Sequence, residues 1–187
     1  NVLAKLYAGM SLSGLHGPSG NPDIAGIDEG FSQYIRVLWN LQDLPTDNAI
    51  CRWNDVGIPE MCKMEWSADN SFVKAMYSRI YYQIPIANVF IKETSDESMT
   101  EKGFSNEEQE ELRMYRAEAR FLRALSYYHA MDLFGNVPFV DETSPIGVFL
   151  PEQIQRANLF SWIESELKAI ENILLTASAA PYGRASQ

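Results

Sequence analysis

Apolar residues recur every three or four positions in five separate stretches of this chain, and that spacing predicts amphipathic helices. In one of these stretches Phe31, Tyr34, Leu38 and Leu41 would share a helix face. No stretch shows the strict alternation of a half-buried strand, so the pattern predicts an all-α fold of antiparallel helix pairs. The five predicted helices span residues 2–13, 27–43, 69–93, 106–134 and 158–175.

The longest predicted helix, 106–134, carries signals at both ends. Ser105 stands three residues before Glu108, which is the spacing of a capping box. Gly135 fits a C-terminal cap, and Pro138 prevents the helix from resuming, so the segment around that proline should run extended. The apolar residues of this helix cover two faces, which indicates that other elements pack on both sides.

Signals elsewhere are shorter. Asp69 or Ser71 is the expected cap of the third helix. The polar stretch 95–103 is interpreted as a connection, and residues 182–187 resemble the cap and first turn of a further helix. Residues 45–68 form the longest predicted loop, and loops of this length inside a compact domain are usually functional or disordered.

Charge narrows the possible partners. The chain has 187 residues, with 15 Lys and Arg against 25 Asp and Glu, a formal charge of −10. No excess of cations is available for phosphates, so we expect no nucleic-acid binding and no adsorption to an anionic membrane. No stretch has the ~18–20 apolar residues of a membrane span. The first residues lack the features of a signal peptide, so an exported protein would have lost its leader and anchoring cysteine already.

The cysteines and histidines are few. Cys51 and Cys62 lie in the predicted loop 45–68, where a disulfide and two buried thiols both remain open. His16 and His129 are the only histidines, and no CxxC motif is present. The sequence therefore predicts no metal site and no cofactor.

The stretch AEARFLRALSYYHAMDLFGNVPFV, residues 117–140, resembles the hallmark of the SusD/RagB family of outer-membrane nutrient-binding lipoproteins. Its parts are a helix of the AEARFLRA type, an aromatic pair, a Leu-Phe-Gly-Asn-Val-Pro stop and an extended apolar segment. Supporting similarity follows the order of the family in three further stretches, residues 77–91, 159–174 and 182–186.

This resemblance implies a fold and a function. The fold would be tetratricopeptide-like helix pairs that support long irregular ligand-binding loops. The function would be non-catalytic binding of an oligo- or polysaccharide at the cell surface, for delivery to a SusC-like TonB-dependent transporter. A lipid anchor outside this sequence would hold the protein at the outer membrane. Because family members are much longer, residues 1–187 would be the N-terminal portion of one helical domain.

Glycan binding needs aromatic faces for sugar rings together with planar polar groups for hydroxyls. The two loops before the hallmark helix offer that mixture. The alternative for each tryptophan is that it covers the core beneath the loop, and the Asp-Asn pair is equally compatible with a turn or a helix cap. The candidate residues are Asn21, Asp23, Asp47, Asn48, Arg52, Trp53, Asp55 and Trp66.

Two other classes of function compete with glycan binding. A tetratricopeptide-like scaffold would bind peptides or proteins, although no 34-residue period is visible. A glycoside hydrolase would need two carboxylates at a defined separation, and no motif selects such a pair. Arg116, Arg120 and Arg123 lie near one helix face, where ion pairs with glutamates are favoured over an anion site.

Overall fold

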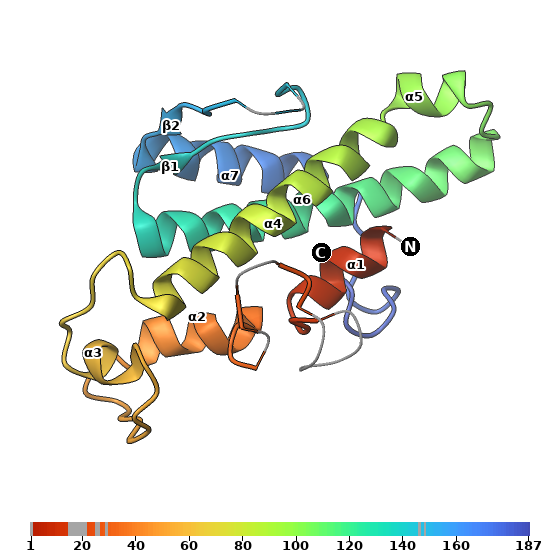
Figure 1. Ribbon diagram of the computed structural model, residues 1–187. Helices are drawn as coiled ribbons and strands as arrows, with labels where there is room; N and C mark the ends of the chain where they lie inside the picture. The colour runs from red at the N-terminus through yellow and green to blue at the C-terminus, as the bar shows by residue number, and fades with distance from the viewer. Residues whose placement is uncertain (1, 15–21, 25–26, 29, 146, 148) are drawn as a thin grey trace. The chain divides into compact units, whose positions relative to one another are not determined.

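The computed structural model describes residues 2–14, 22–24, 27–28, 30–145, 147 and 149–187. Helices dominate this part of the chain, which confirms the all-α prediction (Figure 1). The elements are α1 (Val2–Gly9), α2 (Tyr34–Asp43), α3 (Ile58–Cys62), α4 (Ser71–Glu93), α5 (Asp96–Glu101), α6 (Asn106–Phe134), β1 (Val137–Pro138), β2 (Gln153–Ile154) and α7 (Arg156–Ile170).

The chain forms two compact units. One comprises Asn1–Leu6 with Gln83–Gln187, and the other is Tyr7–Tyr82. The boundaries fall within α1 and α4, so each of these helices contributes residues to both units. The assignment of the whole sequence to the N-terminal portion of one domain stays a prediction.

In the unit Tyr7–Tyr82, α2 begins seven residues later than the sequence predicts. The Asp28 carboxylate accepts a hydrogen bond from the Gly30 N–H at 2.6 Å, and the Ser32 N–H donates to the Asp28 carbonyl at 3.2 Å. This local pairing forms a turn in place of the first helical turns, because Asp favours such turns over helix interiors. The predicted helix 27–43 is therefore wrong in its first part.

A buried arginine holds the same unit together. Arg79 of α4 is 1% exposed. Its Nη1 donates to Asp23 Oδ1 at 2.7 Å, Nε donates to the Ser32 carbonyl at 2.6 Å, and Nη2 donates to the Ser13 carbonyl at 3.2 Å. A buried guanidinium is tolerated only when its donors are satisfied. Arg79 therefore links three segments that are far apart in the sequence.

In the other unit, α6 has the ends that the sequence predicts. The Ser105 Oγ accepts from the Glu108 N–H at 3.3 Å, and the Glu108 carboxylate accepts from the Ser105 N–H at 2.8 Å. Gly135 adopts a φ of 75°, and its N–H donates to the Met131 carbonyl. The capping box and the glycine cap are both confirmed. The segment after Gly135 is extended and includes β1, which pairs antiparallel with β2.

Helices α6 and α7 lie side by side and antiparallel (Figure 1). Tyr127 packs against Trp162, with ring centroids 5.3 Å apart, while Ala117 lies in a buried cluster with Ile170. The residue numbers on the two helices run in opposite directions along the contact. Most of α6 between Ala117 and Met131 is buried, which agrees with the predicted packing on two faces.

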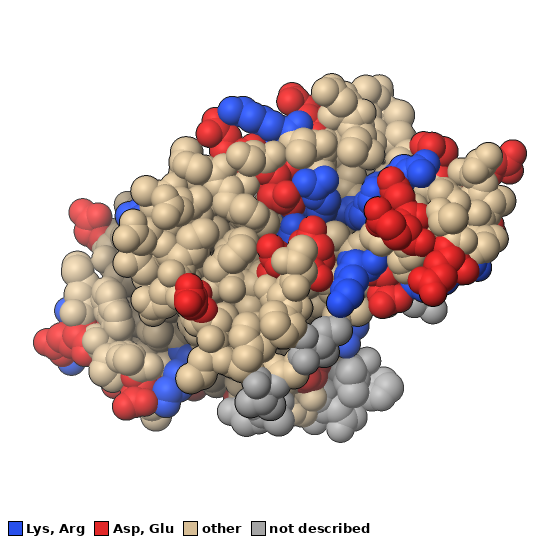
Figure 2. Space-filling view, turned by 90° about the horizontal axis from the view of Figure 1, so that it is seen from above, with Lys and Arg blue, Asp and Glu red and all other residues tan. Residues whose placement is uncertain are grey.

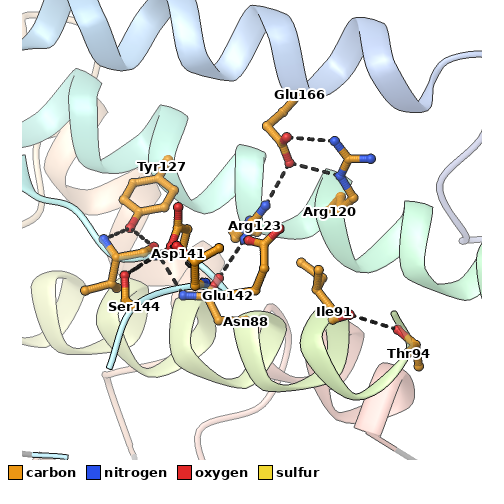
Figure 3. A network of polar contacts seen from close by, with 12 residues as sticks. Asn88, Ile91, Thr94, Arg120, Arg123, Tyr127, Asp141, Glu142, Ser144 and Glu166 are labelled. Atoms are coloured by element: carbon orange, nitrogen blue, oxygen red, sulfur yellow. Dashed lines mark hydrogen bonds and ion pairs between the residues drawn. The ribbon is translucent and has the colours of Figure 1, made fainter. Parts of the chain in front are cut away.

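Two arginines of α6, Arg120 and Arg123, are paired with acidic groups from other elements (Figure 3). Glu166 of α7 accepts from Arg120 Nη2 at 2.7 Å and from Arg123 Nη2 at 2.8 Å. Arg123 also pairs with Glu142, and Asn88 Oδ1 of α4 accepts from it at 2.8 Å. The expected ion pairs with glutamates are confirmed for Arg120 and Arg123, and their partners lie on α7 and in the turn at Glu142 rather than on α6 itself.

Surface charge is mixed where α5 meets the start of α6. Figure 2 shows acidic and basic side chains next to one another on this part of the surface. Arg116, the third arginine of the predicted set, pairs there with Asp96 at 3.0 Å rather than with a glutamate, and Arg113 shares the same aspartate at 3.2 Å. Among the helices of the described residues, none combines the length and the hydropathy that a membrane crossing requires.

The remaining differences from the predictions are local. The loop 45–68 contains the short helix α3, and the polar connection 95–103 contains α5. Asn70, rather than Asp69 or Ser71, caps α4, because its Oδ1 accepts from the Phe72 N–H at 2.9 Å.

Two segments after α6 also differ from the prediction, namely the bounds of α7 and the last residues of the chain. Helix α7 begins and ends earlier than the predicted 158–175. Residues 182–187 form a turn followed by irregular structure rather than a helical turn. Arg184 in this stretch donates to Glu118 Oε2 of α6 at 2.9 Å, so its role is an ion pair with the hallmark helix.

Candidate functional site

A hollow of about 320 Å³ opens in the unit Tyr7–Tyr82, beside the first half of the loop 45–68. Three stretches of the chain contribute to it: the turn and α2, the loop before α3, and the start of α4. The residues that line it are Asp28, Phe31, Arg36, Trp53, Asp55, Val56, Ile58, Ser71 and Phe72.

The loop is attached to α4 at a glycine. Gly57 has a φ of 99°, and its carbonyl accepts from Asn70 Nδ2 at 3.1 Å. Its neighbour Val56 presents a carbonyl that accepts from Ser71 Oγ at 3.2 Å. A Cβ at residue 57 would lie 3.0 Å from the Phe72 ring, so only glycine allows both the backbone angle and this approach.

Aromatic rings form two sides of the hollow. Trp53 is 62% exposed, so most of its indole surface faces solvent. Phe31 contacts Phe72 with ring centroids 4.7 Å apart, and Phe72 is buried. The result is an open aromatic face on Trp53 and an aromatic wall anchored in the core beside it. Such faces suit the apolar side of a flat, partly polar ligand.

Polar groups stand next to the exposed indole. The Arg36 guanidinium carbon lies 6.0 Å from the centroid of the Trp53 ring. Arg36 Nη1 donates to the Gly30 carbonyl at 2.8 Å, which holds the guanidinium in place. Asp28 and Asp55 contribute the carboxylates of the lining. A planar donor and two acceptors beside an aromatic face can hydrogen-bond to hydroxyl groups of a ring that stacks on the face.

The predicted candidate residues do not all gather here. Trp53 and Asp55 line the hollow together, whereas Trp66 is 43% exposed and lies outside its lining. Asp23 is 11% exposed at its side chain and is bound to Arg79. Asn21 lies outside the described residues.

The other three candidates are exposed in the first part of the loop. Asn48 belongs to a turn, in which its N–H donates to Thr46 Oγ1 at 3.1 Å, and Asp47 is its exposed neighbour. Arg52 is exposed next to Trp53. The lining of the hollow includes none of these three side chains.

Sequence reasoning named two of the nine lining residues and missed seven, among them the three that come from the stretch before the loop 45–68. Asp28 and Phe31 were assigned to a helix, although Gly30 between them is a signal for a turn. Arg36 interrupts the apolar residues of α2 and is the only cation in that helix, which was the available signal. Within the described residues, no group of three or more His, Cys, Asp or Glu side chains could hold a metal ion.

Comparison with known proteins relates the chain as a whole to a family. A family model with the description "Starch-binding associating with outer membrane", of the SusD-like type, matches residues 39–183. The "Starch-binding protein SusD" of Bacteroides thetaiotaomicron is 36% identical over all 187 residues. The "SusD-like protein P2" of Formosa agariphila is 32% identical over 73 residues, which are 39% of this chain and 13% of that protein.

Solved structures agree on the fold. A SusD-like carbohydrate-binding protein of Bacteroides fragilis aligns with a TM-score of 0.64 and 24% identity, over 99% of this chain and 33% of that chain. A laminarin-binding SusD-like protein aligns with a TM-score of 0.66 and 19% identity, over 99% of this chain and 36% of that chain. The chain covers 32% of the Bacteroides thetaiotaomicron protein, so it spans about a third of the length of these relatives.

Proposed function

Since this chain belongs to the SusD-like family, we propose that it is part of a non-catalytic glycan-binding protein and that the hollow beside Trp53 is a glycan-binding surface. The observation that carries the proposal is the exposed indole of Trp53 with Arg36 next to it. An exposed indole with a guanidinium and two carboxylates in the same hollow combines the apolar face and the few polar groups that ligand sites use.

The chemistry of the lining fits a sugar. One ring face of a pyranose is mostly C–H, and it can lie on the Trp53 indole. The hydroxyl groups at the ring edge would then meet the Arg36 guanidinium as donor and the carboxylates of Asp28 and Asp55 as acceptors. The relatives named for starch and for laminarin bind glucans by name, so glucans are the first ligands to test.

Location and partner form a second part of the proposal. The family is described as associating with the outer membrane. We infer a lipoprotein exposed at the outer-membrane surface, anchored outside residues 1–187, that passes its glycan to a SusC-like TonB-dependent transporter. Co-purification of the full-length protein with a transporter of that class from detergent-solubilised outer membranes would support this part. Recovery of the full-length protein without any transporter of that class would overturn the delivery role.

The direct test of glycan binding is calorimetric titration with a panel of oligo- and polysaccharides. Trp53→Ala should weaken binding at least tenfold, since truncation of a central aromatic contact typically costs ~2 kcal/mol or more. Trp39→Ala is the matched control, because Trp39 is 50% exposed on α2 and outside the lining of the hollow. It should leave the affinity within about twofold of wild type.

Three results would count against the proposal. Equal losses of glycan affinity in Trp53→Ala and Trp39→Ala would show that the binding site is not the hollow. Binding of peptides but of no glycan would favour the competing function, a tetratricopeptide-like scaffold for protein partners. Release of shortened sugars during the titration would contradict a non-catalytic role.

A further inference from the structure

The two cysteines of the chain flank the residues of the proposed site. Cys51 stands two residues before Trp53, and Cys62 is the last residue of α3. Both are free thiols in the structure, and both are half-buried. Between them lie four of the nine lining residues of the hollow, namely Trp53, Asp55, Val56 and Ile58. A bond between these cysteines would therefore close a loop that carries nearly half of the lining.

The two cysteines already meet in space. Cys62 Sγ donates to the carbonyl oxygen of Cys51 at 3.8 Å. This contact brings the sulfur of one cysteine to the backbone of the other across eleven positions of sequence. A disulfide requires Cα atoms roughly 4.4–6.8 Å apart. We expect short movements of the two side chains and of the loop to be sufficient for the bond, because the Cys62 sulfur already contacts the backbone of Cys51.

In the part of the chain that the structure describes, side-chain hydrogen bonds to the loop backbone hold it on the C-terminal side of Trp53. At the Gly57 end, Asn70 and Ser71 of the α4 start donate to the carbonyls of Gly57 and Val56. Residues 51–55 belong to no helix or strand. The loop is therefore attached to α4 by hydrogen bonds after Trp53. A bond between Cys51 and Cys62 would attach it before Trp53 as well.

We propose that Cys51 and Cys62 form an intramolecular disulfide in the exported protein and that this bond holds the Trp53 loop in its binding conformation. The proposal rests on the proposed function for its location, because disulfides persist only in oxidising compartments. The expected consequence is a smaller entropy cost when a ligand orders the loop, which strengthens binding without any new contact.

The chemistry is thiol–disulfide exchange with a disulfide oxidant, such as a periplasmic dithiol oxidase or oxidised glutathione. The thiolate of one cysteine attacks a sulfur of the oxidant, forms a mixed disulfide and releases one thiol. The thiolate of the second cysteine then attacks the protein sulfur of that mixed disulfide and releases the other thiol. Two protein thiols are oxidised, and the oxidant's disulfide is reduced to two thiols.

Tryptic peptide mapping can detect the bond directly, because trypsin cleaves after Arg52, which lies between the two cysteines in the sequence. Cleavage after Arg36, Arg52 and Lys63 yields the peptides 37–52 and 53–63, each with one cysteine. Wild-type protein would be equilibrated with oxidised glutathione, alkylated, digested and mapped by mass spectrometry without reduction. We expect a single species that contains both peptides and separates on reduction. Two alkylated peptides, two glutathione adducts or disulfide-linked dimers of the protein would each overturn the proposal.

The effect on the loop has its own measurement. Closing a loop of this length should raise Tm by roughly 5–10 °C relative to the reduced protein. In the double variant Cys51→Ser with Cys62→Ser, oxidant should leave Tm unchanged. For any glycan that binds, reduction of wild type should weaken binding several-fold and leave the double variant unaffected. Equal affinity of oxidised and reduced wild type would refute the role of the bond in holding the loop.

Failure of the disulfide proposal can be distinguished from failure of the proposed function, because the peptide map requires no ligand. A cross-linked peptide in a protein that binds no glycan would overturn glycan binding and leave the disulfide established. Glycan binding that is lost in Trp53→Ala, in a protein whose thiols stay free under oxidant, would overturn the disulfide alone.

Discussion

Tyr127 offers a sharp test of how the hallmark helix controls the segment that follows it. Its hydroxyl donates to the Val140 carbonyl at 2.7 Å and accepts from the Val140 N–H at 2.8 Å. The ring packs between Phe139 and Trp162, with centroid distances of 5.3 Å to each. Tyr127→Phe removes the oxygen and keeps the ring, so it isolates the two hydrogen bonds that attach the extended segment to α6.

The magnitude follows from what the substitution leaves behind. The Val140 carbonyl keeps a second donor, Asn88 Nδ2 at 3.2 Å. Loss of the Tyr127 donor to this carbonyl should therefore lower the free energy of unfolding by about 1 kcal/mol. The Val140 N–H loses the Tyr127 hydroxyl as its acceptor, which lowers the free energy of unfolding by roughly a further 1–2 kcal/mol because the bond was buried. We expect Tyr127→Phe to lower the free energy of unfolding by about 2–3 kcal/mol in urea titrations.

A matched control is available on the same helix. The Tyr115 hydroxyl donates to Glu111 one turn away in α6, and the Arg184 guanidinium lies over the Tyr115 ring, a contact that phenylalanine keeps. Tyr115→Phe should change the free energy of unfolding by less than about 0.5 kcal/mol. Equal effects of the two substitutions would refute the idea that Tyr127 holds the extended segment.

The pH dependence provides a second check. Burial raises the pKa of Tyr127 above its ordinary value of 10, so the folded protein keeps the phenol neutral where the unfolded chain ionises it. A raised folded pKa contributes stability that is complete below pH 10 and is lost as pH rises further. The stability difference between wild type and Tyr127→Phe should therefore be about 1.4 kcal/mol smaller at pH 11 than at pH 9. A constant difference over that range would contradict the assignment.

Two further substitutions test the site and the helix network. Gly57→Ala should destabilise by roughly 2–3 kcal/mol in urea titrations, through its positive φ and the approach to the Phe72 ring, whereas Gly103→Ala, with a positive φ and open space, should cost only about 1 kcal/mol. Glu166→Gln should cost about 3 kcal/mol, because it leaves Arg123 and its neighbouring arginine without a shared charge partner. Burial raises the pKa of Glu166, but hydrogen bonds from both arginines outweigh burial and hold this pKa below 4.5, so wild type should lose stability as pH falls below 4.5, and the variant should lack that part of the slope.

Local signals predicted the helices well. Ser105 and Glu108 form the expected capping box, and Gly135 ends α6 as expected, because each signal acts within four residues of the chain. Errors arose where a local alternative competed with the apolar pattern. Asp28 and Gly30 form a turn at positions where the periodicity alone predicted the start of α2.

The candidate site was predicted only in part. Composition singled out the loop 45–68, and the structure brings Trp53 and Asp55 from it into one hollow. Arg36 and Asp28 joined them from a distant stretch, and no spacing in the sequence relates these positions. Asp23 looked equivalent to Asp55 in the sequence, yet it is bound to the buried Arg79.

The sequence by itself therefore determined the longer helical elements, both caps of α6 and the family pattern of residues 117–140, since these depend on contacts between near neighbours in the chain. The tertiary structure alone decided which polar residues are structural partners and which remain exposed. Glu166 meets Arg120 across 46 positions, and Asp23 meets Arg79 across 56. Such pairs form only when packing brings distant segments together, because burial makes an unpaired charge costly and so selects the partner that geometry supplies.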